Sequence, residues 1–428
     1  MERFVITGGR KLFGEVEING AKNAILPILA ACLLTEEECV FEKVPLLEDV
    51  FVMCDVLRHY GAKICWQGST LTVNTGNIES RESPDCLMKK LRASNLILGP
   101  LINRFPYVCI PFPGGCAIGS RPMNYHLSAL LRLGADISDC GNCIRARASS
   151  LRGADICLDF PSVGATENLM MAAVKAHGNT MIRNAAREPE VCDLAGMLNS
   201  MGARVKGAGS DVIYIEGVNT LHGTVYRVIP DRIELGTLMT AAAIAGGDVL
   251  FKNVETSMSS AVIAKLRESG ILIREYDDSI RVTSKQRLKA MDIKTMPYPG
   301  FPTDMQPQFM ALMSVANGTS VICESIFENR FKHADEMRRM GADIKIVGEA
   351  AVVRGKDLLK GAHVEATDLR AGAALTLMGL YAEGETTVDN VAYIDRGYQN
   401  LEESLSLIGA DIYRVSLDTA LVKSTCLK

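Results

Sequence analysis

One short segment of the chain combines a nucleophilic side chain, a cation and backbone freedom. It reads Phe112-Pro113-Gly114-Gly115-Cys116-Ala117-Ile118-Gly119-Ser120-Arg121-Pro122. Its three glycines and two prolines are typical of a mobile loop with unusual dihedral angles. A thiol near a cationic side chain ionises more readily and becomes reactive. The alternative is a surface turn with a passive thiol, but the adjoining Arg121 and the glycines favour a chemical role for Cys116.

Basic side chains recur beside expected helix starts and glycine-containing loops. A helix N-terminus presents free amide N–H groups and the positive end of the helix dipole, so it attracts anions. Any single arginine in such a place is more simply a solvated side chain beside a capped helix. As a set in related positions, the basic residues predict a cleft for a polyanionic ligand. They are Lys22, Arg92, Arg121, Arg330, Arg370 and Arg396.

The elements that carry these residues repeat along the chain. A glycine, usually followed by alanine and then by apolar or β-branched residues, occurs at Gly61, Gly134, Gly202, Gly270, Gly341 and Gly409. The spacings are 73, 68, 68, 71 and 68 residues. A period this regular indicates one supersecondary unit used six times. The longest spacing contains the Cys116 segment.

One unit shows the expected order of elements, βαβαββ. The first helix of each unit is rich in Ala, Leu and Met and should be buried, with Thr, Asp, Ser or Asn near its start as a cap. The second helix is amphipathic and ends at the repeated glycine. For the unit around Gly202 we expect a strand over 154–160, a turn over 161–166, a helix over 167–177, a strand over 180–184, a helix over 191–201, and strands over 203–206 and 212–216.

The composition indicates a protein with more than one domain. The chain has 428 residues, of which 48% are hydrophobic and 22% charged, with a net charge of −4. This charge gives no reason to expect nucleic-acid binding. The N-terminal residues 1–6 resemble a strand and not a signal peptide. The longest apolar stretch, 24–34, contains Pro27 and is too short to span a bilayer, so we expect no membrane association.

The cysteines favour a reducing compartment. Thirteen is an odd number, and several of them lie in apolar runs, which predicts buried thiols in a cytoplasmic protein. These are Cys32, Cys54, Cys109, Cys157 and Cys323. The motif Cys140-Gly-Asn-Cys143 is isolated, so a turn with two incidental thiols is favoured over a zinc site.

Nine segments, in unbroken order from Met1 to about Ile412, resemble the UDP-N-acetylglucosamine 1-carboxyvinyltransferases, the enolpyruvyl transferases of peptidoglycan synthesis. Each segment alone is modest evidence, but their shared order is specific. The segments are Asn19–Ala24, Leu91–Ser94, Pro113–Pro122, Ser162–Thr166, Ala185–Glu190, Phe301–Gln306, Phe327–Phe331, Ala366–Arg370 and Asp395–Gly397.

The resemblance implies an α/β fold, the two-domain inside-out α/β barrel of the enolpyruvyl transferases. Each domain would contain three βαβαββ repeats. One domain would span 22–229, and the other would combine 1–21 with 230–428, so the chain would cross between domains twice. The resemblance also implies a cytoplasmic enzyme that uses no cofactor and no metal.

The implied reaction transfers the enolpyruvyl group of phosphoenolpyruvate to the 3-hydroxyl of UDP-N-acetylglucosamine and releases phosphate. It is the first committed step of peptidoglycan synthesis and the target of fosfomycin, which alkylates the family's cysteine. By resemblance, Cys116 is the proton donor, with a role in product release as the alternative, and Asp304 accepts the proton of the hydroxyl. The other interpretation of Asp304 is a helix cap, since an expected helix begins at Thr303-Asp304, and both roles could hold at once.

The resemblance also assigns the binding residues. Lys22 and Asn23 would bind phosphoenolpyruvate, and Lys22, Arg121 and Arg396 would hold its phosphate. Arg330 and Arg370 would complete the cationic pocket. The UDP-N-acetylglucosamine site would consist of Arg92, Arg121, Pro122, Met123, Asn124, Tyr125, Ser162, Val163, Gly164, Asp304 and Ile326.

Two other functions compete with this one. The pair Asn124-Tyr125 departs from the acidic residue and leucine of many family members, which bears on nucleotide affinity and leaves the reaction intact. The alternative is a related enolpyruvyl transferase that acts on another acceptor, such as shikimate 3-phosphate or a different nucleotide. The enzyme that uses shikimate 3-phosphate lacks the cysteine loop, so Cys116 argues against it. A ring-shaped nucleic-acid clamp would need a positive chain. The oligomeric state stays open.

Overall fold

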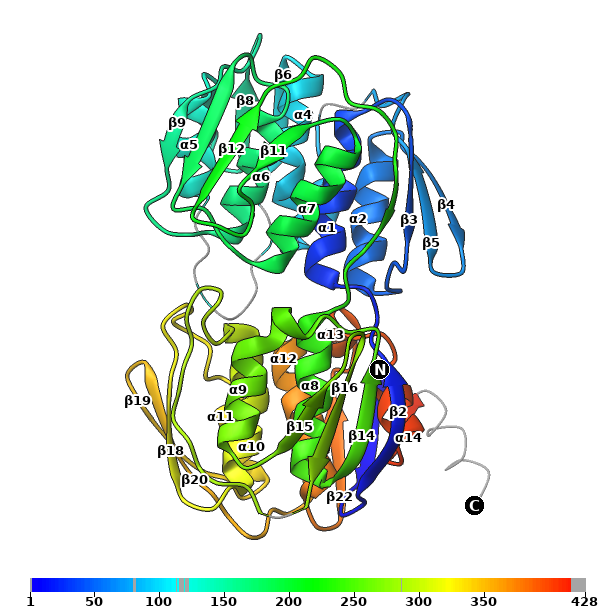
Figure 1. The fold of residues 1–428 in the computed structure, drawn as a ribbon, viewed down its shortest axis with the longest axis vertical. Coiled ribbons are helices and arrows are strands. Elements are labelled where there is room, and N and C mark those ends of the chain that lie inside the picture. Colours follow the sequence, from blue (N-terminus) through cyan, green and yellow to red (C-terminus); the bar gives the residue numbers. More distant parts are fainter. Residues whose placement is uncertain are drawn as a thin grey trace. The chain divides into compact units, whose positions relative to one another are not determined.

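The structure is a computed structural model that describes residues 2–79, 82–112, 114, 119, 123–285 and 287–416. These residues form two compact units. Unit 1 contains the chain up to Asn19 and again from Pro230, whereas unit 2 contains the chain from Gly20 to Ile229 apart from Gly119. The colours of Figure 1 show that the blue N-terminal strands and the green-to-red second half belong to the same unit.

Unit 1 contains three four-stranded sheets. The first has the order β15 (Leu272–Glu275), β16 (Ser279–Ser284), β14 (Gly247–Lys252) and β2 (Leu12–Glu17). The second has the order β17 (Ile293–Lys294), β18 (Thr319–Cys323), β20 (Ala350–Arg354) and β19 (Asp343–Val347). The third has the order β21 (His363–Glu365), β22 (Glu385–Asp389), β1 (Glu2–Thr7) and β23 (Asp411–Ser416). The expected N-terminal strand is thus confirmed, and it lies beside the strands from the far end of the chain.

Unit 2 has two four-stranded sheets and one three-stranded sheet. The first has the order β13 (Val225–Arg227), β3 (Glu38–Glu42), β5 (Thr70–Asn74) and β4 (Lys63–Gln67). The second has the order β11 (Arg204–Lys206), β12 (Val212–Glu216), β10 (Asn179–Arg183) and β9 (Asp155–Cys157). The three-stranded sheet has the order β6 (Tyr107–Pro111), β8 (Cys143–Arg147) and β7 (Asp136–Asp139). A parallel bridge from Glu82 to Cys109 extends the last sheet.

The four-stranded sheets share one pairing pattern. In each, an edge strand runs parallel to its neighbour, and the other two pairs are antiparallel. Parallel neighbours need a crossover connection. For β9 and β10 this connection is the helix α6 (Val163–Ala173).

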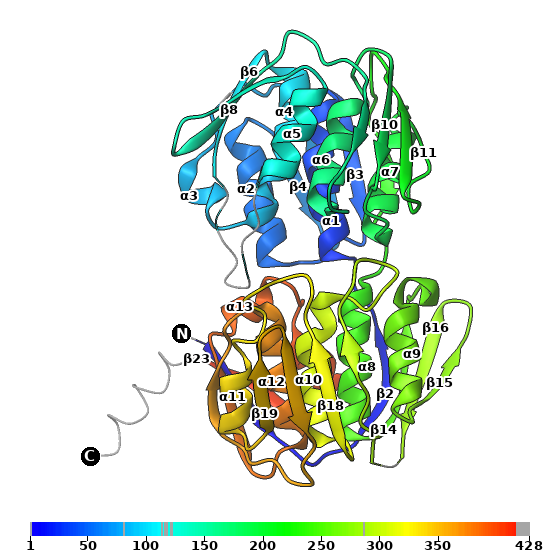
Figure 2. The same cartoon turned by 90° about the vertical axis from the view of Figure 1, so that its left-hand side faces the viewer.

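Three apolar helices pack against one another inside each unit, and the sheets lie outside them (Figures 1 and 2). In unit 1 they are α8 (Arg232–Ala245), α10 (Gln306–Val315) and α12 (Leu369–Tyr381). In unit 2 they are α1 (Lys22–Ala31), α4 (Leu98–Arg104) and α6. Every residue of α10 is buried, which confirms the expected burial of the first helices. Short helices also lie in the connections, among them α3 (Asp85–Met88), η1 (Cys32–Leu34) and η3 (Thr256–Ser259).

The repeated glycines end the outer helices and lead into strands. All six have a positive φ, between 90° and 101°, a range that glycine adopts readily. In each case the residue after the glycine donates its N–H to the carbonyl five residues earlier, which is the longer bond of a Schellman motif. The helices are α2 (Glu48–His59), α5 (Asn124–Arg132), α7 (Pro189–Ser200), α9 (Ser260–Glu268), α11 (Ala334–Arg339) and α14 (Leu401–Leu407).

The expected capping residues are present at only some of the inner helices. Ser162, Asp231 and Asp368 accept backbone N–H groups at the starts of α6, α8 and α12. Helix α1 follows Ala21, and α10 follows Met305, without a side-chain cap. The turn predicted over 161–166 is also wrong in part, because the cap at Ser162 allows α6 to begin at Val163, four residues before the predicted start.

The described cysteines are all free thiols, and Cys32 and Cys54 are buried as expected. Cys157 is exposed, contrary to the prediction, because alternation along the edge strand β9 turns Ile156 inward and Cys157 outward. The Cys140–Cys143 motif forms the turn between β7 and β8. Among the helices within the described residues, none has both the length and the apolar character needed to cross a membrane.

Replacing Gly341 tests the glycine terminators. A Cβ added there meets no atom within 4 Å, so only the backbone conformation at φ 94° opposes a side chain. We expect Gly341→Ala to lower the free energy of unfolding by about 1–2 kcal/mol, measured by urea denaturation. Gly341→Asn is the matched control and should lose less, since asparagine tolerates this conformation better. Equal stability of Gly341→Ala and the wild type would contradict the assignment.

Candidate active site

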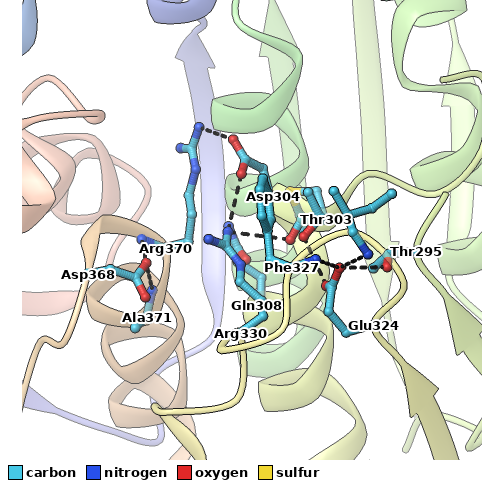
Figure 3. A network of polar contacts seen from close by, with 12 residues as sticks. Thr295, Thr303, Asp304, Gln308, Glu324, Phe327, Arg330, Asp368, Arg370 and Ala371 are labelled. Atoms are coloured by element: carbon cyan, nitrogen blue, oxygen red, sulfur yellow. Dashed lines mark hydrogen bonds and ion pairs between the residues drawn. The ribbon is translucent and has the colours of Figure 1, made fainter. Parts of the chain in front are cut away.

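Asp304 lies between two buried guanidinium groups in unit 1 (Figure 3). Its Oδ1 is 3.2 Å from Nη2 of Arg330, and its Oδ2 is 3.0 Å from Nη2 of Arg370. The arginine side chains are only 1% and 2% exposed, whereas that of Asp304 is 28% exposed. Asp304 belongs to the 3₁₀ helix η4 (Thr303–Met305), and neither η4 nor α10 has a side-chain cap. The carboxylate is therefore an ion-pair partner and not the alternative helix cap.

Glu324 attaches the loop that carries Ile326 and Arg330 to the same turn. Its Oε1 accepts the N–H of Ile326 at 2.9 Å and the hydroxyl of Thr295 at 2.9 Å. Its Oε2 accepts the hydroxyl of Thr303 at 2.9 Å. These bonds hold the chain after β18 next to Asp304, as Figure 3 shows. Ile326 and Arg330, two of the predicted site residues, thus lie in one network of polar contacts with Asp304, a third predicted residue.

Arg370 is held from both its main chain and its side chain. Asp368 accepts the N–H of Arg370 at 2.9 Å as the cap of α12. The guanidinium lies 5.1 Å from the centre of the Tyr398 ring, a cation–π distance. The Tyr398 hydroxyl in turn contacts Thr237 of α8 at 2.9 Å and Gln308 of α10 at 3.1 Å. All three inner helices of unit 1 therefore position this one side chain.

Several guanidinium N–H groups around Asp304 remain available for a further anion. Nε of Arg330 and both Nε and Nη1 of Arg370 are buried and have no hydrogen-bond partner among the described residues. A buried donor left without a partner costs about 1–3 kcal/mol. The single carboxylate of Asp304 is also shared between two guanidinium groups. The arrangement is typical of a site that binds a carboxylate or phosphate group.

The segment that carries Arg396 is anchored on both sides. Helix α13 (Ala392–Asp395) ends directly before Arg396. The Asp395 carboxylate receives two hydrogen bonds from Arg414, at 2.9 Å and 2.7 Å. Arg414 also pairs with Glu402 at 2.6 Å and with Glu2 at 2.8 Å. These hydrogen bonds, with Asp395 first, raise the pKa of Arg414 despite its partial burial.

On the other side of Arg396, the chain packs closely on Arg370. A Cβ added to Gly397 would lie 2.3 Å from Cδ1 of Leu369 and 3.6 Å from Nη1 of Arg370. A side chain at this position would therefore displace the end of the Leu369 side chain. Tyr398 then enters the core beneath Arg370, as described above. Arg396 thus lies between Asp395, which Arg414 anchors, and Gly397, which packs close to Arg370.

In unit 2, Lys22 is the first residue of α1 and is nearly buried. Its Nζ lies 2.7 Å from Oδ2 of Asp49 in the first turn of α2. Asn23 follows in the same helical turn. The predicted phosphoenolpyruvate residues of this unit therefore lie at the N-terminus of an inner helix.

His126 joins three segments of the predicted nucleotide-sugar site. Its Nδ1 accepts a hydrogen bond from Nδ2 of Asn168 in α6, at 3.1 Å. A Cβ added to Gly164 would lie 3.3 Å from its ring. Burial, with a contribution from the charge of Arg92, lowers the pKa of His126 from 6.5 to about 4. Arg92 begins the 3₁₀ helix η2 (Arg92–Ile97), so the histidine lies among residues from η2, α5 and α6.

The other predicted residues of unit 2 lie beside this histidine in the chain or at the start of α6. Met123 precedes α5, and Asn124 and Tyr125 begin it. Ser162 caps α6, and Val163 and Gly164 are its first residues. Cys116, Arg121 and Pro122 lie outside the described residues. Sequence reasoning missed His126, Asn168, Tyr398 and Arg414, and only His126 had a sequence signal, its place directly after Tyr125.

The low pKa of His126 predicts a loss of stability in acid. Between pH 6.5 and 4 the unfolded chain binds a proton that the folded chain excludes, so the free energy of unfolding falls as the pH falls. The full effect is about 3 kcal/mol. We expect His126→Gln to lose less stability than the wild type across this range, measured by urea denaturation. The same pair measured at pH 7.5 isolates the packing change, and parallel pH profiles would contradict the assignment.

Comparison with known proteins identifies the family of this chain. The family model of EPSP synthase (3-phosphoshikimate 1-carboxyvinyltransferase) matches residues 6–405. UDP-N-acetylglucosamine 1-carboxyvinyltransferase 1 of Carboxydothermus hydrogenoformans is 54% identical over 416 residues, which cover 97% of this chain and 99% of that one. UDP-N-acetylglucosamine 1-carboxyvinyltransferase 2 of Clostridium tetani is 53% identical over 417 residues, covering 97% and 100%.

Solved structures share the fold. The enolpyruvyl transferase NikO from Streptomyces tendae has a TM-score of 0.87 at 24% identity, covering 97% of this chain and 99% of that one. EPSP synthase from Acinetobacter baumannii has a TM-score of 0.77 at 20% identity, covering 97% and 100%. The chain has the α/β fold of the enolpyruvyl transferases, and it belongs within that family to the UDP-N-acetylglucosamine 1-carboxyvinyltransferases.

Proposed function

We propose that this chain transfers the enolpyruvyl group of phosphoenolpyruvate to the 3-hydroxyl of UDP-N-acetylglucosamine, with release of phosphate. The observation that carries the proposal is the Asp304 carboxylate between the buried guanidinium groups of Arg330 and Arg370. It combines a proton acceptor with guanidinium N–H donors for a polyanionic substrate. The family membership of the chain supports the same reaction.

The reaction is an addition followed by an elimination. The acceptor hydroxyl gives up its proton and its oxygen bonds to C2 of phosphoenolpyruvate, while C3 gains a proton. Loss of a proton from C3 then restores the double bond and expels phosphate from C2. Arginine side chains and helix N-termini can stabilise the developing charges without a metal or a cofactor.

We assign the following roles to the residues. Asp304 accepts the hydroxyl proton, since its carboxylate is the most exposed member of its ion-pair network. Cys116 donates the proton to C3. Arg330 and Arg370 bind anionic oxygens with their free N–H groups, and planar guanidinium groups suit such contacts. Phosphoenolpyruvate is bound by Lys22, Asn23, Arg121 and Arg396. The nucleotide sugar is bound by Arg92, Pro122, Met123, Asn124, Tyr125, Ser162, Val163, Gly164 and Ile326.

The scaffold proposed for this reaction is an inside-out α/β barrel with three βαβαββ repeats in each of two domains. The shared pairing pattern of the sheets and the common φ of the six glycines support it. The domains are 22–229 and, together, 1–21 and 230–428. We place the enzyme in the cytoplasm, in keeping with the free thiols of its described cysteines.

A phosphate-release assay tests the function. With phosphoenolpyruvate we expect phosphate in the presence of UDP-N-acetylglucosamine and none with UMP, because the proposed site binds the sugar hydroxyl. Fosfomycin should abolish the release, and Cys116→Ser should lose most activity and resist alkylation. Turnover with UMP would favour the alternative acceptor. Full activity in the presence of fosfomycin would contradict the role of Cys116.

The anchoring of Arg396 can be tested separately. Arg414→Gln leaves Asp395, Glu402 and Glu2 without their shared cation, so the segment before Arg396 should shift. We expect KM for phosphoenolpyruvate to rise about tenfold, a loss of about 1.4 kcal/mol in binding, with a smaller change in kcat. The matched control is Arg10→Gln, since Arg10 makes one exposed ion pair, with Asp411. A lower kcat with unchanged KM would contradict the binding role.

A further inference from the structure

Two thiols meet on the three-stranded sheet of unit 2. Cys109 lies in β6 and Cys143 in the antiparallel neighbour β8. Cys109 faces Arg145 and Pro111 faces Cys143, so the two cysteines are diagonal neighbours on one face of the sheet. Their sulfur atoms are 3.0 Å apart. A disulfide bond is about 2.05 Å long, so only about 1 Å of further approach is needed.

This face of the sheet is accessible to small molecules. The alternate residues Val108, Ile110, Ile144 and Ala146 are fully buried and form the inner face. Cys109 and Cys143 are partly exposed on the outer face. Cys140 is exposed at the turn after β7, where its N–H donates to the carbonyl of Cys143. Accessibility separates these thiols from the buried Cys32 and Cys54.

Arg145 makes the surroundings of these thiols electropositive. The thiolate form of Cys140, then Tyr107, and then Cys109 and Cys143 raise the pKa of Arg145. The attraction is mutual, because the charge of Arg145 acts to lower the pKa of Cys143. The hydrogen bond to Cys109, with some desolvation, raises the pKa of Cys143.

We infer that Cys109 and Cys143 form a reversible disulfide by exchange with low-molecular-weight disulfides. The geometry, the partial exposure and the neighbouring guanidinium carry this inference, which is independent of the proposed function. Three cysteines could also bind zinc, but the described residues contain no group of three Cys, His, Asp or Glu side chains placed to hold a metal.

The exchange is balanced in two steps. The Cys109 thiolate attacks a disulfide RSSR, forming a mixed disulfide and releasing one thiolate RS⁻. The Cys143 thiolate then attacks the Cys109 sulfur and releases the second RS⁻. The two cysteine protons end on the released thiols, so the protein pair is oxidised and one RSSR is reduced to two RSH.

The placement also explains why this disulfide would be labile. Diagonal residues in an antiparallel pair are about 7–8 Å apart at Cα, beyond the usual span of a disulfide of about 4.4–6.8 Å. The strands must shift slightly when the bond forms. Strained and exposed disulfides are more easily reduced than structural ones.

The experiment uses the full chain carrying Cys116→Ser, which removes the cysteine proposed to be reactive. The protein is incubated with oxidised glutathione, alkylated, and mapped by mass spectrometry without reduction. We expect a peptide pair joined through Cys109 and Cys143, with two thiols lost, and full reversal by reduced glutathione. Cys32 and Cys54 should stay unalkylated, which verifies that the protein is folded.

Matched variants separate the proposed pair from its neighbours. Cys140→Ser should still form the bond, whereas Cys109→Ser should not. Arg145→Gln should slow formation roughly threefold, because fewer thiolates are present although each is more nucleophilic. Arg147→Gln on the same strand face is the control and should not slow it. A Cys140–Cys143 bond, mixed disulfides with glutathione alone, or unchanged thiols would overturn the inference.

Discussion

The ion pairs of Asp304 with Arg330 and Arg370 are the interaction on which the architecture of unit 1 depends. Buried charges are costly unless paired, and removing one partner from such a group is strongly destabilising. The three residues come from η4, from the loop after β18 and from the start of α12. Their contacts therefore require that these separate elements be placed to within a few tenths of an ångström. Glu324, Asp368 and Tyr398 supply the hydrogen bonds and stacking that meet this requirement.

The inner helices divide structural and chemical roles between their sides and their ends. Their sides are apolar and close-packed, and the few polar groups among them, such as Thr237 and Gln308, are hydrogen-bonded to Tyr398. Their starts bear Lys22, Val163 and Arg370. The repeated glycines lie on the outer helices instead and set their C-terminal ends. A substitution at a repeated glycine should therefore change the stability of the fold, whereas one at the start of an inner helix should change the charge of the site.

Sequence reasoning succeeded where the signal is local. The glycine conformations, the burial of the inner helices and the strand over 212–216 follow from period, composition and alternation within a few residues. Sequence reasoning failed where the residue that decides a contact is distant in the chain. Nothing near Asp304 reveals that Arg330 and Arg370 contact it, and the pairing of Arg414 with Asp395 spans two elements. The exposure of Cys157 likewise depends on β9 lying at a sheet edge, which pairing decides.

The ion pairs also bear on how the proposed chemistry begins. A carboxylate between two cations is a weaker base than a free carboxylate, because protonation would sacrifice both attractions. An anionic group of the substrate that binds Arg330 and Arg370 shares their positive charge with Asp304. Every hydrogen bond that such a group takes from the carboxylate makes the carboxylate a better proton acceptor. Under the proposed function, substrate binding and activation of the base are therefore one electrostatic event, and the surplus of buried guanidinium groups is what couples them.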